Sequence, residues 1–170
     1  TTIDMIKLEI PLGLKMKCWE HIKSNNMGNR FDFNGSMEQQ YVGLIGENMV
    51  RNYLGLPYSF SVGFDGGYDF IFNGNKVDVK TMGRSVDPKP HYVNNFVAYQ
   101  REFDCDIFYF TSINKKTSTI SLCGWIWKKD FILEASHFEK DSTRKRDDGT
   151  TFKTQAPLYE ISNDKLNPIK

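Results

Sequence analysis

The stretch from Gly67 to Lys80 constrains the possible folds more than any other part of the chain. Two short segments rich in aromatic and β-branched residues, 68–72 and 76–81, flank the tripeptide Asn73-Gly74-Asn75. Asn and Gly accept the positive φ angles of tight hairpin turns, so this pattern predicts two antiparallel strands joined by a short loop. At least one β-hairpin is therefore expected near the middle of the chain.

The length of the hairpin loop decides which side chains meet. If the loop is Asn73-Gly74, Asp69 lies directly opposite Asp78, with the two Cβ atoms about 5 Å apart. If the loop is Gly74-Asn75, Asp69 faces Lys80 instead. Either loop puts Asp69, Asp78 and Lys80 on one face, because side chains alternate along a strand. A loop of three residues would move Asp69 to the other face.

The remaining elements follow from hydrophobic spacing and from turn residues. Ser36 and Gln39 form a capping-box pattern ahead of a helix over 37–54, which Gly55 or Pro57 ends. The other segments are expected as helices over 14–24, 94–103 and 128–135, as strands over 2–10, 58–62, 107–113, 119–127 and 158–161, and as loops over 25–35, 83–90 and 138–154, the last charged and mobile.

This order of elements predicts an α/β (α+β) fold, a single domain over residues 1–170 with a central mixed β-sheet flanked by helices. Within it, we expect residues 1–35 to form an N-terminal strand and helix appendage and residues 36–135 to form the core. Residues 136–170 would then supply a charged loop and a C-terminal strand.

Composition excludes several classes of protein. The 170 residues carry a net charge of +1, with 25% charged and 39% apolar residues, which is typical of a folded domain and not of a disordered chain. No apolar stretch of about 20 residues could cross a membrane, and the first residues lack the features of a signal peptide. Three widely spaced cysteines do not suggest a disulfide framework. We therefore expect a cytoplasmic or otherwise intracellular protein, not secreted and without a membrane partner.

Acidic side chains gather in and near the predicted hairpin. Two opposed carboxylates repel each other, and the apolar residues around Asp69 and Asp78 predict a half-buried setting in which a divalent cation would compensate them. Mg²⁺ prefers one or two carboxylates together with waters and phosphates. Glu47, on the largely apolar face of the preceding helix, supplies a third acid. Gly46 beside it allows a backbone or a ligand to approach closely.

These residues resemble the PD-(D/E)XK nuclease superfamily, which has the restriction-endonuclease-like fold. The resemblance consists of Gly46-Glu47 in a helix, Asp69 on a strand and Asp78-Val79-Lys80 on its hairpin partner. It covers roughly residues 36–80 and, more loosely, the rest of the chain, where 124–131 resembles the strand-to-helix end of many members. Tyr68 stands where the motif has Pro. Gln100 is followed four residues later by Asp104, so the exonuclease branch that carries Gln and Tyr at this spacing is not supported.

The resemblance implies a restriction-endonuclease-like core and a Mg²⁺-dependent DNA nuclease, expected to be an endonuclease, with Mn²⁺ as a substitute ion. Asp69, Asp78 and the carbonyl of Val79 would hold the metal, Glu47 would bind the same ion or a second one, and Lys80 would position the attacking water. The catalytic set is then Glu47, Asp69, Asp78 and Lys80. The alternative is a non-catalytic member of the same fold that binds nucleic acid or a protein partner.

Basic residues near the hairpin could contact DNA phosphates, and the candidates are Arg51, Arg84, Lys89 and His91. For each of them an ordinary solvated charge is an equally good interpretation. A second basic cluster, Lys140 with 144–146, is either a DNA-gripping arm or a solvated loop, and acidic neighbours favour the loop. The Cys18-x-x-His21 spacing lacks the second half of a zinc site. A homodimer is a further expected partner, because double-strand cleavage commonly uses two active sites.

Overall fold

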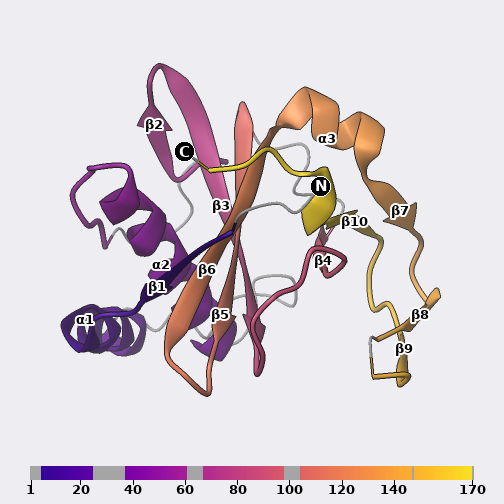
Figure 1. Ribbon diagram of the computed structural model, residues 1–170, viewed down its shortest axis with the longest axis horizontal. Coiled ribbons are helices and arrows are strands. Elements are labelled where there is room, and N and C mark those ends of the chain that lie inside the picture. Colours follow the sequence, from indigo (N-terminus) through magenta and orange to yellow (C-terminus); the bar gives the residue numbers. More distant parts are fainter. Residues whose placement is uncertain (1–4, 25–36, 61–66, 98–103, 147, 170) are drawn as a thin grey trace.

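The computed structural model describes residues 5–24, 37–60, 67–97, 104–146 and 148–169. Its centre is a curled, mixed sheet of five strands in the order β1-β6-β5-β3-β2 (Figure 1). The strands are β1 (Ile6–Glu9), β2 (Phe70–Phe72), β3 (Asn75–Arg84), β5 (Ile107–Asn114) and β6 (Thr119–Trp127). β3 and β5 run parallel and the other neighbouring pairs are antiparallel. The expected α/β fold with a mixed sheet is confirmed.

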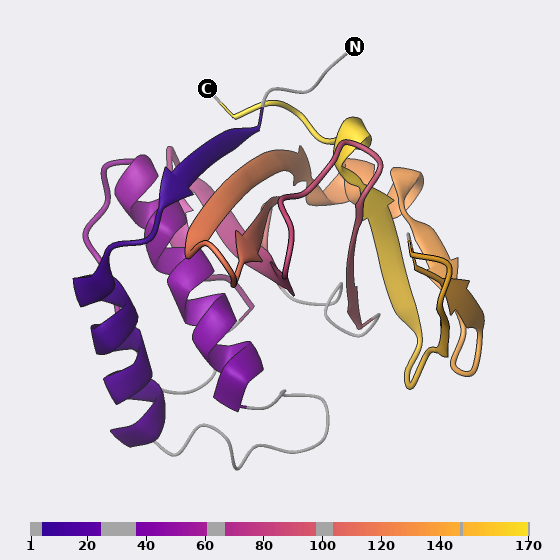
Figure 2. The same cartoon turned by 60° about the horizontal axis from the view of Figure 1, so that its bottom comes forward.

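Two helices, α1 (Leu12–Ser24) and α2 (Met37–Tyr53), lie side by side against one face of this sheet (Figure 2). Their apolar side chains, such as Ile45, pack on alternate residues of β3, including Val77 and Val79. α2 ends at Tyr53, one residue before its predicted end, and Gly55, which has a φ of 81°, follows in the turn. The backbone N–H groups of Gly55 and Leu56 close the last turn, a left-handed cap that glycine adopts without strain.

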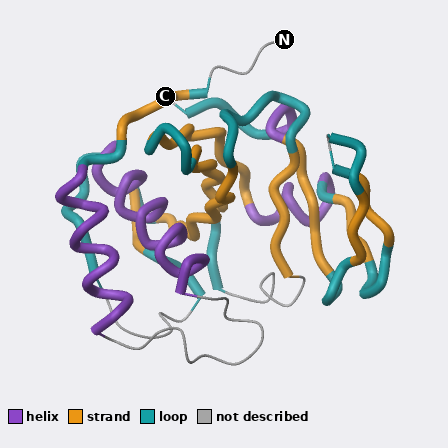
Figure 3. Tube along the Cα trace, turned by 90° about the horizontal axis from the view of Figure 1, so that it is seen from below, coloured by secondary structure: helices purple, strands orange, loops and turns teal. Residues whose placement is uncertain are grey.

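The opposite face of the sheet carries a second, smaller core. There α3 (Lys128–Glu134) and a three-stranded sheet cover the main sheet, and Figure 3 shows this second sheet on the side away from α1 and α2. The order of its strands is β4-β10-β7, where β4 is Val93–Val97, β7 is Ser136–Phe138 and β10 is Leu158–Ser162. The core between them is largely aromatic, with Phe96, Phe108, Phe110, Phe131 and Tyr159 in mutual contact.

A short hairpin, β8 (Thr143–Lys145) and β9 (Thr151–Lys153), extends beyond the second sheet. The single-turn 3-10 helix Asn163–Lys165 follows β10. None of the helices in the described ranges is long and apolar enough to cross a membrane.

The predicted hairpin is confirmed, and its loop is Asn73-Gly74. Phe72 pairs with Asn75, and the two loop residues have φ angles of 50° and 81°, the positive values that a two-residue turn between twisted strands requires. β3 continues to Arg84, beyond the predicted end of this strand. It can do so because it keeps its pairing with β5 up to the Arg84–Asn114 position.

Several expected elements differ in the structure. The helix expected over 94–103 is wrong for residues 94–97, which belong to β4 and pair with β10; residues 98–103 lie outside the described part. The loop expected over 138–154 contains β8 and β9. No strand forms over residues 58–60, and residues 61–62 are not described. The segment expected as an N-terminal appendage contributes β1 to the edge of the main sheet, and α1 starts at Leu12, before its predicted beginning at Leu14.

Candidate functional site

The even-numbered residues of β3 face away from α2, towards the second core. Asp78 and Lys80 lie next to each other on this face, with 2.9 Å between Asp78 Oδ2 and Lys80 Nζ. Asp78 is 7% exposed, and its Oδ2 atom is buried without a hydrogen bond from any described residue. The Lys80 ammonium lies 5.1 Å from the centre of the Phe96 ring. A buried carboxylate is thus compensated by a neighbouring cation but is not fully satisfied as a hydrogen-bond acceptor.

Asp69 lies immediately before β2 and extends the hairpin. Its backbone N–H donates over 2.8 Å to the carbonyl of Val77, the residue that already pairs with Phe70, so Asp69 lies just outside the regular ladder and not on the predicted strand. The Asp69 side chain turns to the β3 backbone, where its Oδ2 accepts a hydrogen bond of 2.7 Å from the Val79 N–H. Asp78 and Lys80 thus share one face of β3 as predicted, whereas the carboxylate of Asp69 is held at the Val79 backbone by a hydrogen bond and not by its place in the strand alternation.

Glu47 is linked to the same hairpin indirectly, by an ion pair with Arg51. On α2, Arg51 donates from Nε to Glu47 Oε2 over 2.8 Å and from Nη2 to the carbonyl oxygen of Asp69 over 2.8 Å. The Arg51 guanidinium also covers the Phe70 ring at 5.0 Å. Arg51 was expected to contact phosphate, but the structure directs two of its donors inward, to Glu47 and to the hairpin. The spacing of four residues between Glu47 and Arg51 is itself typical of a helical ion pair.

Gly46 has a structural role beside Glu47. A Cβ atom built on Gly46 would lie 1.8 Å from Oγ1 of Thr81, so the missing side chain lets α2 approach β3 closely. The close approach expected from the sequence is thus made by a strand of the main sheet. This contact sets the distance between the part of α2 that carries Glu47 and the strand β3.

The acids of this region do not form a ready-made metal cage. Among the described residues, no group of three or more His, Cys, Asp or Glu side chains is arranged to hold a metal ion. The donor set nevertheless suits a hard cation, because it consists of oxygen ligands, although the Lys80 ammonium already lies 2.9 Å from Asp78 Oδ2. Asp78, Asp69 and the carbonyl of Val79 are the groups that could hold such an ion.

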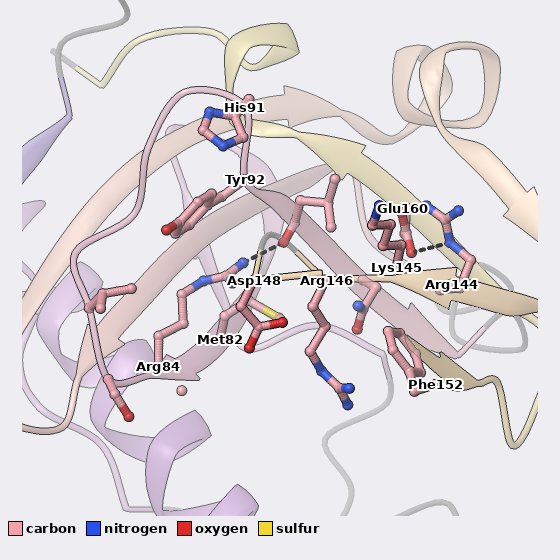
Figure 4. Close-up of a pocket in the computed structure, with 15 residues that line it drawn as sticks. Met82, Arg84, His91, Tyr92, Arg144, Lys145, Arg146, Asp148, Phe152 and Glu160 are labelled. Carbon is pink, nitrogen blue, oxygen red and sulfur yellow. Dashed lines mark hydrogen bonds and ion pairs between the residues drawn. The ribbon is translucent and has the colours of Figure 1, made fainter. Parts of the chain in front are cut away.

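A basic cleft of about 1020 Å³ opens farther along the same face of β3 (Figure 4). It lies between the end of β3, strand β4 and the β8–β9 hairpin. Arg84 and His91, both expected to contact nucleic acid, line it, and the cluster Arg144, Lys145 and Arg146 forms its other wall. Lys89 is exposed and is not among the lining residues. The two basic groups that the sequence left separate are therefore parts of one surface.

The arginines on the two walls of the basic cleft differ in their partners: Arg144 is paired with an acid, whereas Arg84 hydrogen-bonds to a neutral carbonyl. Arg144 makes a bidentate ion pair with the buried Glu160 of β10, with distances of 2.7 and 3.1 Å. Arg84 donates from Nη2 to the carbonyl of Val93 over 2.6 Å and lies over the Tyr92 ring at 4.9 Å. Its Nε is buried without a hydrogen bond from the described residues, and burial lowers the pKa of Arg84 below its usual value.

Aromatic side chains of the basic cleft were not expected from the sequence to serve function. The guanidinium of Arg146, the residue after β8, lies 4.5 Å from the centre of the Phe152 ring, on β9. The guanidinium of Arg84 makes the same kind of cation–π contact with the Tyr92 ring. The sequence predicted a helix over 94–103, directly after Tyr92, and a loop over 138–154 around Phe152, so no signal linked the two rings. Cys18 of the Cys18-x-x-His21 pair is buried, and burial raises the pKa of its thiol to about 12.

Comparisons of the chain with protein-family models, with curated proteins and with solved structures found no match.

Proposed function

We propose that this protein is a Mg²⁺-dependent DNA nuclease, an endonuclease that hydrolyses phosphodiester bonds, with a core of the restriction-endonuclease-like kind. The observation that carries the proposal is the grouping of Asp69, Asp78 and Lys80 around Val79 on the β2–β3 hairpin. The resemblance of these residues to the PD-(D/E)XK pattern supplies the expected chemistry. The basic cleft on the same face of β3 supports a phosphate-bearing substrate.

Each residue of the site has a task that its position allows. Asp78 and Asp69 present carboxylate oxygens, and the Val79 carbonyl belongs to the same strand segment, so these groups would hold Mg²⁺, which when bound supplies charge neutralisation and a more acidic water. The Lys80 ammonium, 2.9 Å from Asp78, can orient a water and offset charge on the phosphate. Arg51 holds Glu47 beside the hairpin, where Glu47 adds negative charge.

Nicking of supercoiled plasmid tests the proposal. We expect nicking with Mg²⁺ or Mn²⁺ and none with EDTA. Asp78→Asn and Lys80→Met should each abolish it, whereas Glu20→Gln, which removes one exposed carboxylate from α1, should leave it unchanged. Calorimetric titration with Mn²⁺ separates the two roles, because Asp78→Asn should lose metal binding and Lys80→Met should keep it. Nicking that persists in EDTA, or in folded Asp78→Asn protein, would contradict the proposal.

A second candidate, binding of nucleic acid without cleavage, is favoured by the ion pairs that already engage the acids of the site. Arg51 holds Glu47, and Lys80 holds Asp78. If this candidate is right, the protein binds DNA in the same assay and the plasmid remains intact with every divalent ion.

A further inference from the structure

The half-buried charge of Arg84 has no acidic partner in the described part of the chain. The hydrogen bond that it donates there goes to the neutral carbonyl of Val93, and its Nε donates to no described residue. Burial of an unpaired cation is costly, and the lowered pKa of Arg84 reflects this cost. Arg144, on the opposite wall, provides the contrast, because its charge is compensated by two hydrogen bonds to the carboxylate of Glu160.

We propose that the basic cleft binds a segment of single-stranded nucleic acid, with a backbone phosphate at Arg84 and a base against Arg146. The identity of the ligand as nucleic acid rests on the proposed function. An anion that enters the basic cleft would supply the missing counter-charge of Arg84. Phosphate suits this position, because the planar guanidinium fork matches its oxygens better than a point charge does.

The opposite wall explains why the ligand is a strand and not an isolated phosphate. The Arg146 guanidinium lies 4.5 Å from the centre of the Phe152 ring, within cation–π distance, and a guanidinium backed by an aromatic ring offers its outer face to a base. Lys145 adds a second charge beside it, and Asp148, the nearby acid, is already engaged by the N–H and hydroxyl of Thr150. Cations combined with stacking planes are typical of sites for unpaired strands.

The size and place of the basic cleft point in the same direction. Clefts that enclose a small ligand span about 300–1,000 Å³, so this one is large enough for a short piece of a strand. Lys80 and Arg84 share one face of β3, about 13 Å apart along the strand. A strand lying in the basic cleft would therefore continue towards Asp78 and Lys80 within a few nucleotides.

Fluorescence anisotropy with a short, fluorescein-labelled oligothymidylate tests this inference. EDTA is present throughout, so that binding is measured without cleavage. We expect Arg84→Gln to weaken binding by about tenfold or more, since it removes a charge-assisted hydrogen bond to phosphate. It should also flatten the log–log salt dependence by about 0.7 per lost contact. Arg146→Gln should weaken binding as well, and because Arg146 is exposed, this variant tests the proposal even if Arg84→Gln does not fold.

The matched control is Lys17→Gln, which removes one positive charge from the exposed side of α1, away from the basic cleft. We expect its affinity to equal that of the unaltered protein. An equal loss in Lys17→Gln and Arg146→Gln would indicate general charge attraction and overturn the proposal. A duplex of the same length that binds as tightly as the single strand, or inorganic phosphate that binds at Arg84 while the oligonucleotide does not, would also overturn it.

The binding assay and the plasmid assay fail independently. Oligonucleotide binding that depends on Arg84 and Arg146, in a protein that never nicks plasmid, would keep the strand site and reject the proposed catalysis. Nicking that depends on Asp78, with oligonucleotide affinity unaffected by both arginine variants, would keep the proposed function and reject the strand site.

Discussion

Gly46 shows how a single missing side chain sets the distance between a helix and a sheet. Thr81 fills the space where a Cβ atom would lie, and Thr81 Oγ1 in turn accepts a hydrogen bond from the hydroxyl of Thr111. Glu47, the next residue, is therefore held by backbone packing on one side and by Arg51 on the other. The position of this acid depends on two contacts that involve neither metal nor substrate.

We expect Gly46→Ala to lower the free energy of unfolding by about 1–3 kcal/mol, because the added methyl group overpacks against Thr81. Gly43→Ala is the matched control on the same helix, since a Cβ atom there meets nothing within 4 Å. It should be neutral or stabilising by up to about 1 kcal/mol, as expected for alanine in a helix. Urea denaturation of both variants checks the difference. Equal stability of the two would show that the helix can shift away from β3.

The three cysteine thiols predict a loss of stability at alkaline pH. Burial raises the pKa of Cys18, Cys105 and Cys123 to about 12, whereas an unfolded thiol ionises near about pH 8.5. The folded chain therefore holds these protons after the unfolded chain has released them. Stability is fully present below the unfolded pKa and falls as the pH rises towards the folded value, by about 1 kcal/mol per pH unit for each thiol.

Denaturation at several pH values above about 8.5 measures this slope. Cys123→Ala should flatten the slope by about one third, even if the alanine lowers stability at every pH. Buried Tyr109, whose pKa burial also raises, adds a loss in the same direction and is present in both proteins. An unchanged slope in Cys123→Ala would show that this thiol does not contribute.

At the scale of elements, the β2–β3 hairpin could be predicted because its information is local. Asn73-Gly74 supplies the turn, and the alternation after it places Asp78 and Lys80 on one face. β4 could not be predicted, since Tyr92 and Phe96 are four residues apart, a spacing that fits one face of a helix and one face of a strand equally well. Its pairing with β10, far along the chain, decides in favour of the strand.

The β8–β9 hairpin and the basic cleft could not be predicted from the sequence either, because both depend on contacts between distant segments. Thr143–Lys145 and Thr151–Lys153 are short and polar, so neither shows a hydrophobic period. What places β8 beside the second sheet is the pairing of Arg144 with Glu160, a contact between two segments whose spacing in sequence carries no signal. The same holds for the meeting of Arg84 with the cluster around Arg146.

We expect Arg144→Met to lower the free energy of unfolding by about 3 kcal/mol, because it leaves Glu160 buried without its cation. Lys145→Met, an exposed neighbour, should change stability by less than about 0.5 kcal/mol. The double variant Arg144→Met/Glu160→Gln should recover much of the loss, since the unpaired charge is gone. Thermal unfolding of these variants, together with Glu160→Gln and the unaltered protein, completes the cycle. No recovery in the double variant would mean that Arg144 acts through its packing on Phe138.

For the whole molecule, a net charge of +1 gives no uniform attraction to nucleic acid. Acidic and basic groups are instead separated along one face of β3, with Asp78 towards one end and Arg84 at the other. Odd-numbered residues of the same strand pack against α2. One face of β3 therefore contributes to the core, and the other carries both the Asp78–Lys80 pair and Arg84 of the basic cleft. The predicted homodimer stays a prediction, which sedimentation equilibrium can measure.

This separation predicts that a divalent ion strengthens binding of duplex DNA. Ca²⁺ takes oxygen ligands and would offset the charge of Asp69 and Asp78 before a phosphate approaches. We expect the affinity for a duplex to rise by about tenfold or more when Ca²⁺ is added, and to fall again on chelation. Asp78→Asn should show a smaller response, whereas Glu20→Gln should respond fully. Equal affinity in Ca²⁺ and in EDTA would argue against an ion at the hairpin.

The position of β1 has a consequence for the order in which the chain can fold. Ile6 pairs with Leu122, and Glu9 with Thr119, so β1 has no partner in the main sheet until β6 has been made. Contacts between segments so distant in sequence slow the search for the native state. Closure of the sheet at this edge is therefore a late event in folding, after the β2–β3 hairpin has formed from neighbouring residues.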